Sequence, residues 1–140
     1  MRGISGAAGY VPYRRLDRAA IAATFGSGGG KGTRSVASYD EDTTTMGVEA
    51  ARLALHNAGG ASPGALWFAT ADPAYLEKSN ASTIHAALRL DREIPAIDTG
   101  GAVRSGVGSL RAALDHTGTV LFVTADRRGG LPTSADEASG

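Results

Sequence analysis

Three short apolar segments alternate with helix-forming segments over residues 45–126, and this alternation limits the folds open to the chain. The apolar segments cover residues 65–69, 94–97 and 119–124, and turn-forming residues bound each of them, as expected for strands buried on both faces. Strands that alternate with helices favour right-handed crossovers and a largely parallel sheet. We therefore predict an α/β fold.

The segments around these strands have helical periodicity. The spacing predicts helices over residues 16–25, 45–57, 80–90 and 102–114. In the second of these, Met46, Ala50, Leu53 and Ala54 form one apolar stripe. In the last, the stripe is Val103, Val107, Leu110 and Leu114. A further short strand is expected over residues 4–10, and a brief strand or turn around Val36.

An aspartate follows each of the three strands. These residues are Asp72, Asp98 and Asp126, and in a parallel sheet they lie at the carboxyl edge, where open α/β folds bind ligands. Aspartate is also a common capping and turn residue at any strand end. Both a shared site and three separate caps remain open at this point.

Residues 96–110 predict a strand that ends at Asp98, a turn through Gly100 and Gly101, and a helix from about Ala102. Such a turn exposes backbone N–H groups at one point, where α/β enzymes often place a nucleophile or an oxyanion site. The Gly-rich run over residues 26–32 lacks the spacing of a phosphate-binding loop, so we predict a surface loop there.

Composition excludes several classes of function. The 140-residue chain has zero formal net charge, so it offers no field for nucleic acid or an anionic membrane. It contains no cysteine, which excludes disulfides and thiol catalysis. Its three histidines have no partner at ligand spacing, so no metal site and no cofactor are expected. A soluble, cytoplasmic protein is the expectation.

The turn into the last helix resembles the nucleophile turn of the thiolase superfamily, especially hydroxymethylglutaryl-CoA synthases and β-ketoacyl synthase III. The family places a small residue and then cysteine at the start of the helix, with glycine three residues later. Ala102, Val103 and Gly106 occupy those positions here. The likeness extends to Gly3-Ile4, to residues 31–43, and to Thr124-Ala125-Asp126-Arg127.

Two functional positions depart from the family pattern. The nucleophile position holds Val103, and alignment on Tyr75 and Lys78 places the general acid of the synthases at Ala71. A methyl group carries neither an exchangeable proton nor a nucleophilic lone pair. No catalytic residue is therefore assigned, although Asp72, beside Ala71, is a weak candidate for the acid.

The resemblance implies a coenzyme A thioester as ligand. By analogy with the family, Lys31 and Arg34 are candidates for contacting its phosphates, and Arg104 in the first turn of its helix is a candidate for binding an anion. The full set of candidate ligand-binding residues is Lys31, Arg34, Asp72, Gly100, Gly101 and Arg104.

The family's fold consists of two similar halves, and this chain matches the first. We expect residues 1–140 to form one thiolase-like N-terminal half-domain, with residues 127–140 as a polar tail or loop. The expected partner is a second copy or a separate chain that supplies the second half; an OB-fold acyl-CoA-associated protein is typical of the family. Two functions follow: a non-catalytic subunit that binds acyl-CoA or supports a partner, or an acyltransferase active once assembled.

Overall fold

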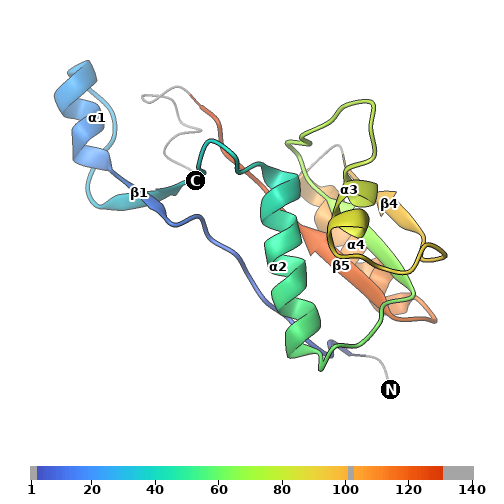
Figure 1. The fold of residues 1–140 in the computed structure, drawn as a ribbon. Helices are drawn as coiled ribbons and strands as arrows, with labels where there is room; N and C mark the ends of the chain where they lie inside the picture. The colour runs from blue at the N-terminus through green and yellow to red at the C-terminus, as the bar shows by residue number, and fades with distance from the viewer. Residues whose placement is uncertain (1–2, 101–102, 131–140) are drawn as a thin grey trace. The chain divides into compact units, whose positions relative to one another are not determined.

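The structure is a computed structural model that describes residues 3–100 and 103–130, and only the backbone of Val103 (Figure 1). Contacts between Cα atoms divide the chain into two compact units. The first comprises Met1–Tyr10 and Asp42–Asp126, and the second Val11–Glu41 and Arg127–Gly140. A single half-domain over residues 1–140 stays a prediction.

A three-stranded parallel sheet forms the centre of the first unit. Its strands are β3 (Ala65–Ala69), β4 (Ala96–Asp98) and β5 (Val120–Thr124), in the order β4-β3-β5. Leu66 lies opposite both Ala96 and Leu121 in the register. The α/β class and the parallel pairing predicted from the alternating segments are therefore confirmed, with β4 beginning two residues later than expected.

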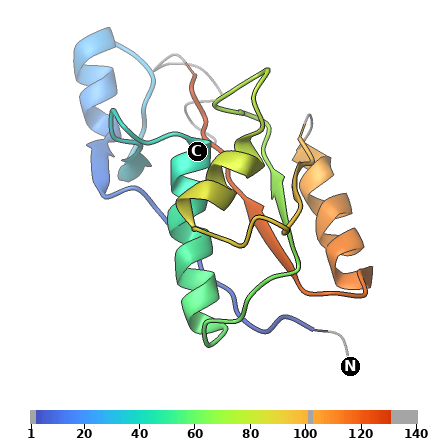
Figure 2. The same ribbon diagram turned by 45° about the vertical axis from the view of Figure 1, so that its right-hand side comes forward.

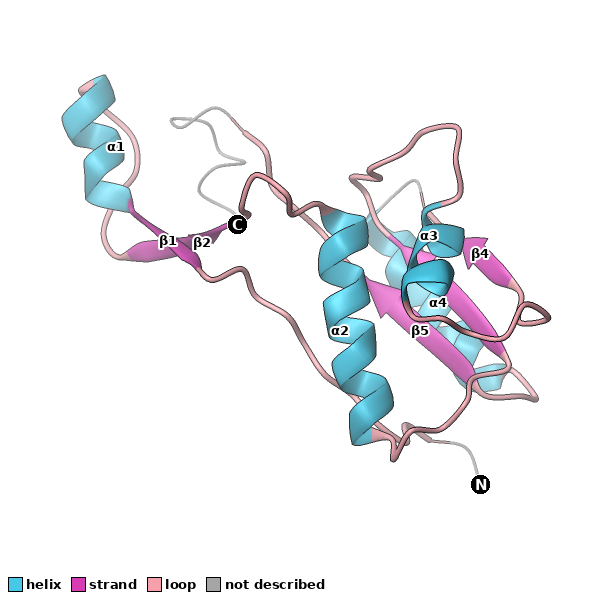
Figure 3. Ribbon diagram, viewed as in Figure 1, coloured by secondary structure: helices cyan, strands magenta, loops and turns pink. Residues whose placement is uncertain are grey.

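Helices cover both faces of this sheet (Figures 2 and 3). The helices α2 (Thr43–Asn57) and α3 (Asn80–Ala87) lie on one face, and α4 (Val103–Asp115) lies on the other. The face towards α2 and α3 holds the core, because alternate strand residues point the same way. This core consists of Val48, Ala51, Leu66, Phe68, Ala81, Ile84, Leu121 and Val123.

The face that α2 presents to the sheet agrees only in part with the predicted stripe. Met46 of that stripe is buried and Leu53 is 45% exposed, whereas Val48 and Ala51, outside the stripe, are buried. Gly47 explains the difference, because a Cβ atom there would lie 3.3 Å from side-chain atoms of both Phe68 and Ile84. The helix thus approaches the sheet at Gly47, a residue that an apolar-stripe pattern does not include.

The expectation of a strand over residues 4–10 is wrong for this structure, in which the segment is irregular. It runs along α2 instead of pairing in the sheet. Asn57 Nδ2 donates a 3.0 Å hydrogen bond to the carbonyl oxygen of Ala7, and a Cβ atom at Gly6 would lie 2.8 Å from the Ala54 carbonyl oxygen. This segment is held by contacts with α2 and not by the hydrogen bonds of a strand ladder.

The second unit is a small antiparallel pair with a helix between its strands. The strands are β1 (Arg14–Asp17) and β2 (Thr33–Val36), and the helix is α1 (Arg18–Phe25). The helix begins two residues later than predicted because Asp17 is its N-cap: the carboxylate accepts a 3.0 Å hydrogen bond from the Ala19 N–H.

The Gly-rich run after α1 is a surface loop, as predicted, and its glycines are required by its shape. Gly29 has a φ of +74°, and a Cβ atom there would collide with the carbonyl oxygen of Arg18. The Arg18 N–H donates a 2.9 Å hydrogen bond to the carbonyl oxygen of Gly32. The loop therefore closes tightly onto the start of α1.

Candidate functional site

The three aspartates that follow the strands of the first unit lie on the same side of the sheet. Because β3, β4 and β5 are parallel, their carboxyl ends meet at one edge, beside which Asp72, Asp98 and Asp126 follow in the chain. This carboxyl edge is where an α/β sheet of this kind holds its ligands.

Asp98 acts as a cap at this edge. Its Oδ2 accepts a 2.8 Å hydrogen bond from the backbone N–H of Asn80, and its Oδ1 accepts a 2.7 Å bond from that of Ala81. Both donors belong to the first turn of α3, where the helix dipole also favours a negative charge. For Asp98, the capping interpretation of the strand-end aspartates therefore holds.

Asn80 anchors the loop between β3 and α3, a role that sequence reasoning missed. This side chain is 3% exposed. Its Oδ1 accepts hydrogen bonds from the Thr44 hydroxyl at 3.0 Å and the Tyr75 N–H at 3.1 Å, and its Nδ2 donates to the Tyr75 carbonyl oxygen at 2.9 Å. A buried side-chain amide with all these partners fixes α2, α3 and the loop together.

Asp72 and Ala71 lie in the turn that follows β3. The Thr43 hydroxyl donates a 2.6 Å hydrogen bond to the Asp72 carbonyl oxygen, and the Asp72 N–H donates a 3.1 Å bond to the Thr70 hydroxyl. Ala71, the position aligned with the general acid, is exposed. The backbone at this position is held firmly, while the side chain at 71 brings no acid or base.

The strand β4 ends at Asp98, as predicted, and Thr99 and Gly100 begin the turn towards α4. Thr99 donates from its N–H to the Phe68 carbonyl oxygen at 2.7 Å, and a Cβ atom at Gly100 would lie 3.2 Å from the Thr70 carbonyl oxygen. Glycine therefore lets the chain pass close to the neighbouring strand end. The helix begins at Val103, and Gly101 lies outside the described residues.

The remaining ligand-binding candidates are divided between the two units. Arg104 is exposed in the first turn of α4, whereas Lys31 and Arg34 belong to the second unit, with Lys31 exposed. Arg34 Nη2 donates a 3.4 Å hydrogen bond to the Arg128 carbonyl oxygen. A site that joins these cations to the carboxyl edge stays a prediction.

The three histidines lie at the other edge of the sheet. His56 and His85 are in the last turns of α2 and α3, and His116 follows the end of α4. Crossover helices run antiparallel to the strands they connect, so their carboxyl ends lie at the amino edge of the sheet. The described carboxyl edge therefore offers no imidazole as a general base.

Two further findings concern the part of the chain that the structure describes. It holds no group of three or more histidine, cysteine, aspartate or glutamate side chains able to bind a metal ion. None of its helices has the length and apolar character needed to cross a bilayer.

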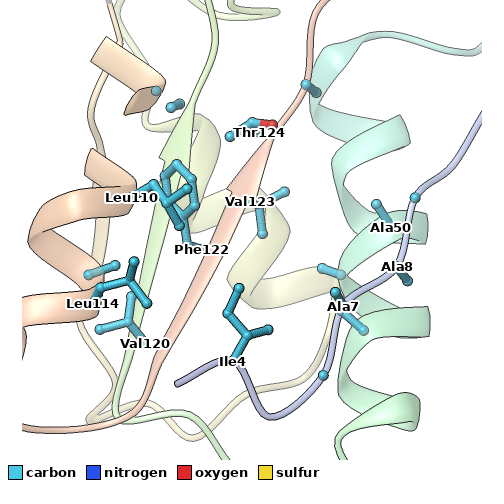
Figure 4. Close-up of a pocket in the computed structure, with 18 of the residues that line it drawn as sticks. Ile4, Ala7, Ala8, Ala50, Leu110, Leu114, Val120, Phe122, Val123 and Thr124 are labelled. Atoms are coloured by element: carbon cyan, nitrogen blue, oxygen red, sulfur yellow. The ribbon is translucent and has the colours of Figure 1, made fainter. Parts of the chain in front are cut away.

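A cavity of about 1060 Å³ lies within the first unit (Figure 4). It separates β5 from residues 3–10, with α2 and α4 on its other sides. Figure 4 shows Phe122, Val120, Leu110 and Leu114 on the α4 side and Ala50, Ala7 and Ala8 on the α2 side. Apart from Asp126 and His116, its lining residues carry no carboxylate or imidazole.

Comparison with known proteins identifies the relatives of the chain. No family model matches it. It is 33% identical over 138 residues to the hydroxymethylglutaryl-CoA synthase of Thermococcus sibiricus, a match that covers 93% of this chain and 39% of the synthase. The chain thus spans about two-fifths of the length of that curated relative.

Solved structures share the fold. The 3-oxoacyl-(acyl carrier protein) synthase III of Pseudomonas aeruginosa superposes with a TM-score of 0.77 at 20% identity, over 96% of this chain and 46% of that one. A priming β-ketosynthase from a polyketide biosynthetic pathway gives 0.74 at 23% identity, over 89% and 41%. The chain therefore has the thiolase-like fold and is similar, over 93% of its length, to hydroxymethylglutaryl-CoA synthases.

Proposed function

We propose that the chain is a subunit of a thiolase-type assembly that binds a coenzyme A thioester without supplying the nucleophile itself. The observation that carries the proposal is the start of α4. The helix begins at Val103, the position that the family resemblance assigns to the attacking cysteine, and the sequence contains no cysteine. A valine side chain cannot form a covalent acyl intermediate.

The rest of the carboxyl edge agrees with a binding role. Ala71 brings no proton donor, the Asp98 carboxylate caps α3, and the histidines lie at the opposite edge. General acid–base catalysis needs a titratable group within hydrogen-bond reach of the reacting atoms. The thioester ligand itself is proposed from the names of the relatives, a hydroxymethylglutaryl-CoA synthase and a 3-oxoacyl-(acyl carrier protein) synthase III.

A second chain is part of the proposal because α4 is incompletely covered. Val107 is 73% exposed, Leu110 40% and Leu114 37%, so the predicted stripe presents apolar surface that association would bury. The partner is proposed to be a second copy or a chain that supplies the other half of the fold. An OB-fold acyl-CoA-associated protein is the other candidate.

The second candidate function is an acyl-transferring or condensing enzyme that becomes active in the assembly. The names of the relatives favour it, since those proteins are synthases. In this case residues of this chain that the family pattern does not identify would take part in the chemistry once a second chain is bound.

Incubation of the pure chain with radiolabelled acetyl-CoA tests the non-catalytic binding role. We expect saturable, non-covalent binding by equilibrium dialysis and no labelled protein after denaturation. Lys31→Ala and Arg34→Ala should each weaken binding severalfold, whereas Arg52→Ala, on the exposed outer face of α2, should not. A stable acyl adduct, or turnover by the chain alone, would contradict the non-catalytic proposal.

A further inference from the structure

The turn between α4 and β5 is closed by a histidine side chain. His116 follows the last residue of α4, and its ring nitrogen Nδ1 accepts a 3.0 Å hydrogen bond from the backbone N–H of Gly118. A backbone N–H can only donate, so this bond requires a ring nitrogen that carries no proton. The imidazole that closes the turn is therefore neutral, with its proton on Nε2.

The same ring nitrogen lies close to a second backbone group. The carbonyl oxygen of Gly118 is 3.3 Å from Nδ1 of His116. A carbonyl oxygen can only accept, so it becomes a partner for Nδ1 when the imidazolium forms and both ring nitrogens carry a proton. The gain of one proton thus turns Nδ1 from an acceptor into a donor, and the N–H of Gly118 loses its partner.

The turn is shaped around the imidazole ring. A Cβ atom at Gly118 would lie 3.3 Å from Cε1 of His116 and 3.5 Å from Nδ1, so glycine lets the backbone lie close against the ring. The ring also packs edge-on against Trp67 of β3, with an angle of 80° between the two ring planes. These two contacts keep the imidazole beside the backbone groups that it binds.

The turn leads directly into the pairing of β5 with β3. The Thr119 carbonyl oxygen, one residue after Gly118, accepts hydrogen bonds from the N–H groups of Gly64 at 2.8 Å and Ala65 at 3.2 Å. These bonds join the start of β5 to the start of β3. A change in the hydrogen bonding of Gly118 therefore acts next to the first pair of these two strands.

Few charged groups surround the imidazole. The strands β3 and β5 carry none. On α4 the charged residues nearest in the chain are Arg111 and Asp115, which form an exposed ion pair with 3.4 Å between Nε and Oδ2. Among the described residues that line the neighbouring cavity, Asp126 brings the one carboxylate, beyond the opposite end of β5, and Tyr10 the one phenol. The side chain at this turn that changes charge between pH 5 and 8 is therefore His116.

We propose that His116 is a pH-sensitive clasp of the turn between α4 and β5. The neutral imidazole closes the turn through the Gly118 N–H, and the imidazolium releases that N–H and loosens the start of β5. Protonation of a histidine shifts two-state elements in this way. His85 differs, because its Nε2 lies 2.9 Å from the Asp91 carbonyl oxygen and can donate to it in both charge states. The clasp requires neither a thioester nor a second chain, so it is independent of the proposed function.

Nuclear magnetic resonance of the full chain, labelled with ¹⁵N, tests the clasp over the range in which imidazole titrates. At the alkaline end, long-range ¹H–¹⁵N spectra should show the His116 proton on Nε2. On acidification the Gly118 amide proton should move upfield with the same midpoint as the His116 ring resonances. The amides of Gly64 and Ala65 should then exchange roughly fivefold faster relative to their intrinsic rates, which is the effect of one neutral hydrogen bond.

Two variants at one position give a matched comparison. His116→Asn keeps an acceptor, the amide oxygen, near the place of Nδ1 but cannot take up a proton, so the Gly118 N–H should stay bound throughout the titration. His116→Phe keeps an aromatic ring against Trp67 but has no acceptor, so the N–H should be released throughout. His85→Gln is the control and should titrate at Gly118 as the unaltered chain does.

Several results would overturn the clasp. One is a proton on Nδ1 of His116 at the alkaline end, and another is a Gly118 amide resonance that does not follow the ring. A pH response that persists in His116→Asn would assign it to another group. A response at Gly118 without faster exchange at Gly64 and Ala65 would overturn the effect on β5. The proton position and the shared midpoint are measured on the unaltered chain, so they decide even if a variant fails to fold.

Discussion

The carboxylate of Asp98, at the end of β4, accepts a 2.8 Å hydrogen bond from the first backbone N–H of α3, that of Asn80. Since the side chain of Asn80 in turn binds the loop after β3 and the Thr44 hydroxyl of α2, two polar residues join two strands and two helices. The carboxyl edge is thereby organised by structural contacts before any ligand is considered.

Asp98→Ala should destabilise the fold by about 1–2 kcal/mol, because it removes a charged cap from two N–H groups of α3. The free energy of unfolding in urea measures the loss. Asp115→Ala is the matched control: its carboxylate forms an exposed ion pair with Arg111, and exposed pairs contribute about 0–1 kcal/mol. Equal losses in the two variants would contradict the capping role.

Asn80→Leu should cost about 2–3 kcal/mol, because it leaves buried partners without their hydrogen bonds. The loop around Tyr75 should also become more sensitive to limited proteolysis. Asn57→Ala, which removes one exposed hydrogen bond to Ala7, should cost about 1 kcal/mol or less. If the hydrogen bonds of Asn80 contributed little to stability, Asn80→Leu and Asn57→Ala would lower the free energy of unfolding by the same small amount.

Gly47→Val should destabilise the protein by about 1–3 kcal/mol through overpacking against Phe68 and Ile84. Gly108→Ala, in α4 with nothing within 4 Å of the added Cβ, should instead stabilise the helix by about 0.5–1 kcal/mol. Thermal melting of both variants tests the claim that glycine serves packing in α2 but not at residue 108. A stable Gly47→Val protein would refute it.

Val103→Cys should produce a reactive thiol. A cysteine at the first residue of α4 is stabilised as thiolate by the helix N-terminus, so iodoacetamide should alkylate it roughly fivefold or more faster at pH 7 than a cysteine in Val107→Cys. The latter position is 73% exposed and lies in the middle of the helix. A slower reaction at residue 103 would count against the assigned nucleophile position.

Much of the first unit could be predicted from the sequence, because apolar periodicity records burial directly. The strand β5 and the helices α2, α3 and α4 lie within three residues of the predicted bounds. The failures have a different physical origin. Residues 4–10 have strand-like composition, but whether they pair depends on a neighbour that no local pattern specifies, and here contacts with α2 prevail.

The candidate site was harder to predict than the fold. The sequence shows an aspartate at or after the end of each strand. It does not show the contacts of the Asp98 carboxylate, because these depend on where the start of α3 lies in space. The buried role of Asn80 gives no sequence signal beyond its fitness for a helix start. Open strand edges are equally invisible, since pairing partners are a property of the folded sheet.

The single tryptophan of the chain, Trp67, lies in the central strand β3. Its ring packs edge-on against the imidazole of His116, with 5.6 Å between the two ring centroids. His116 borders the same cavity that runs along β5. The indole is therefore a native fluorophore in contact with a residue that borders the cavity. Its emission should report on events there in the unlabelled protein, so binding can be followed by titration in an ordinary fluorimeter.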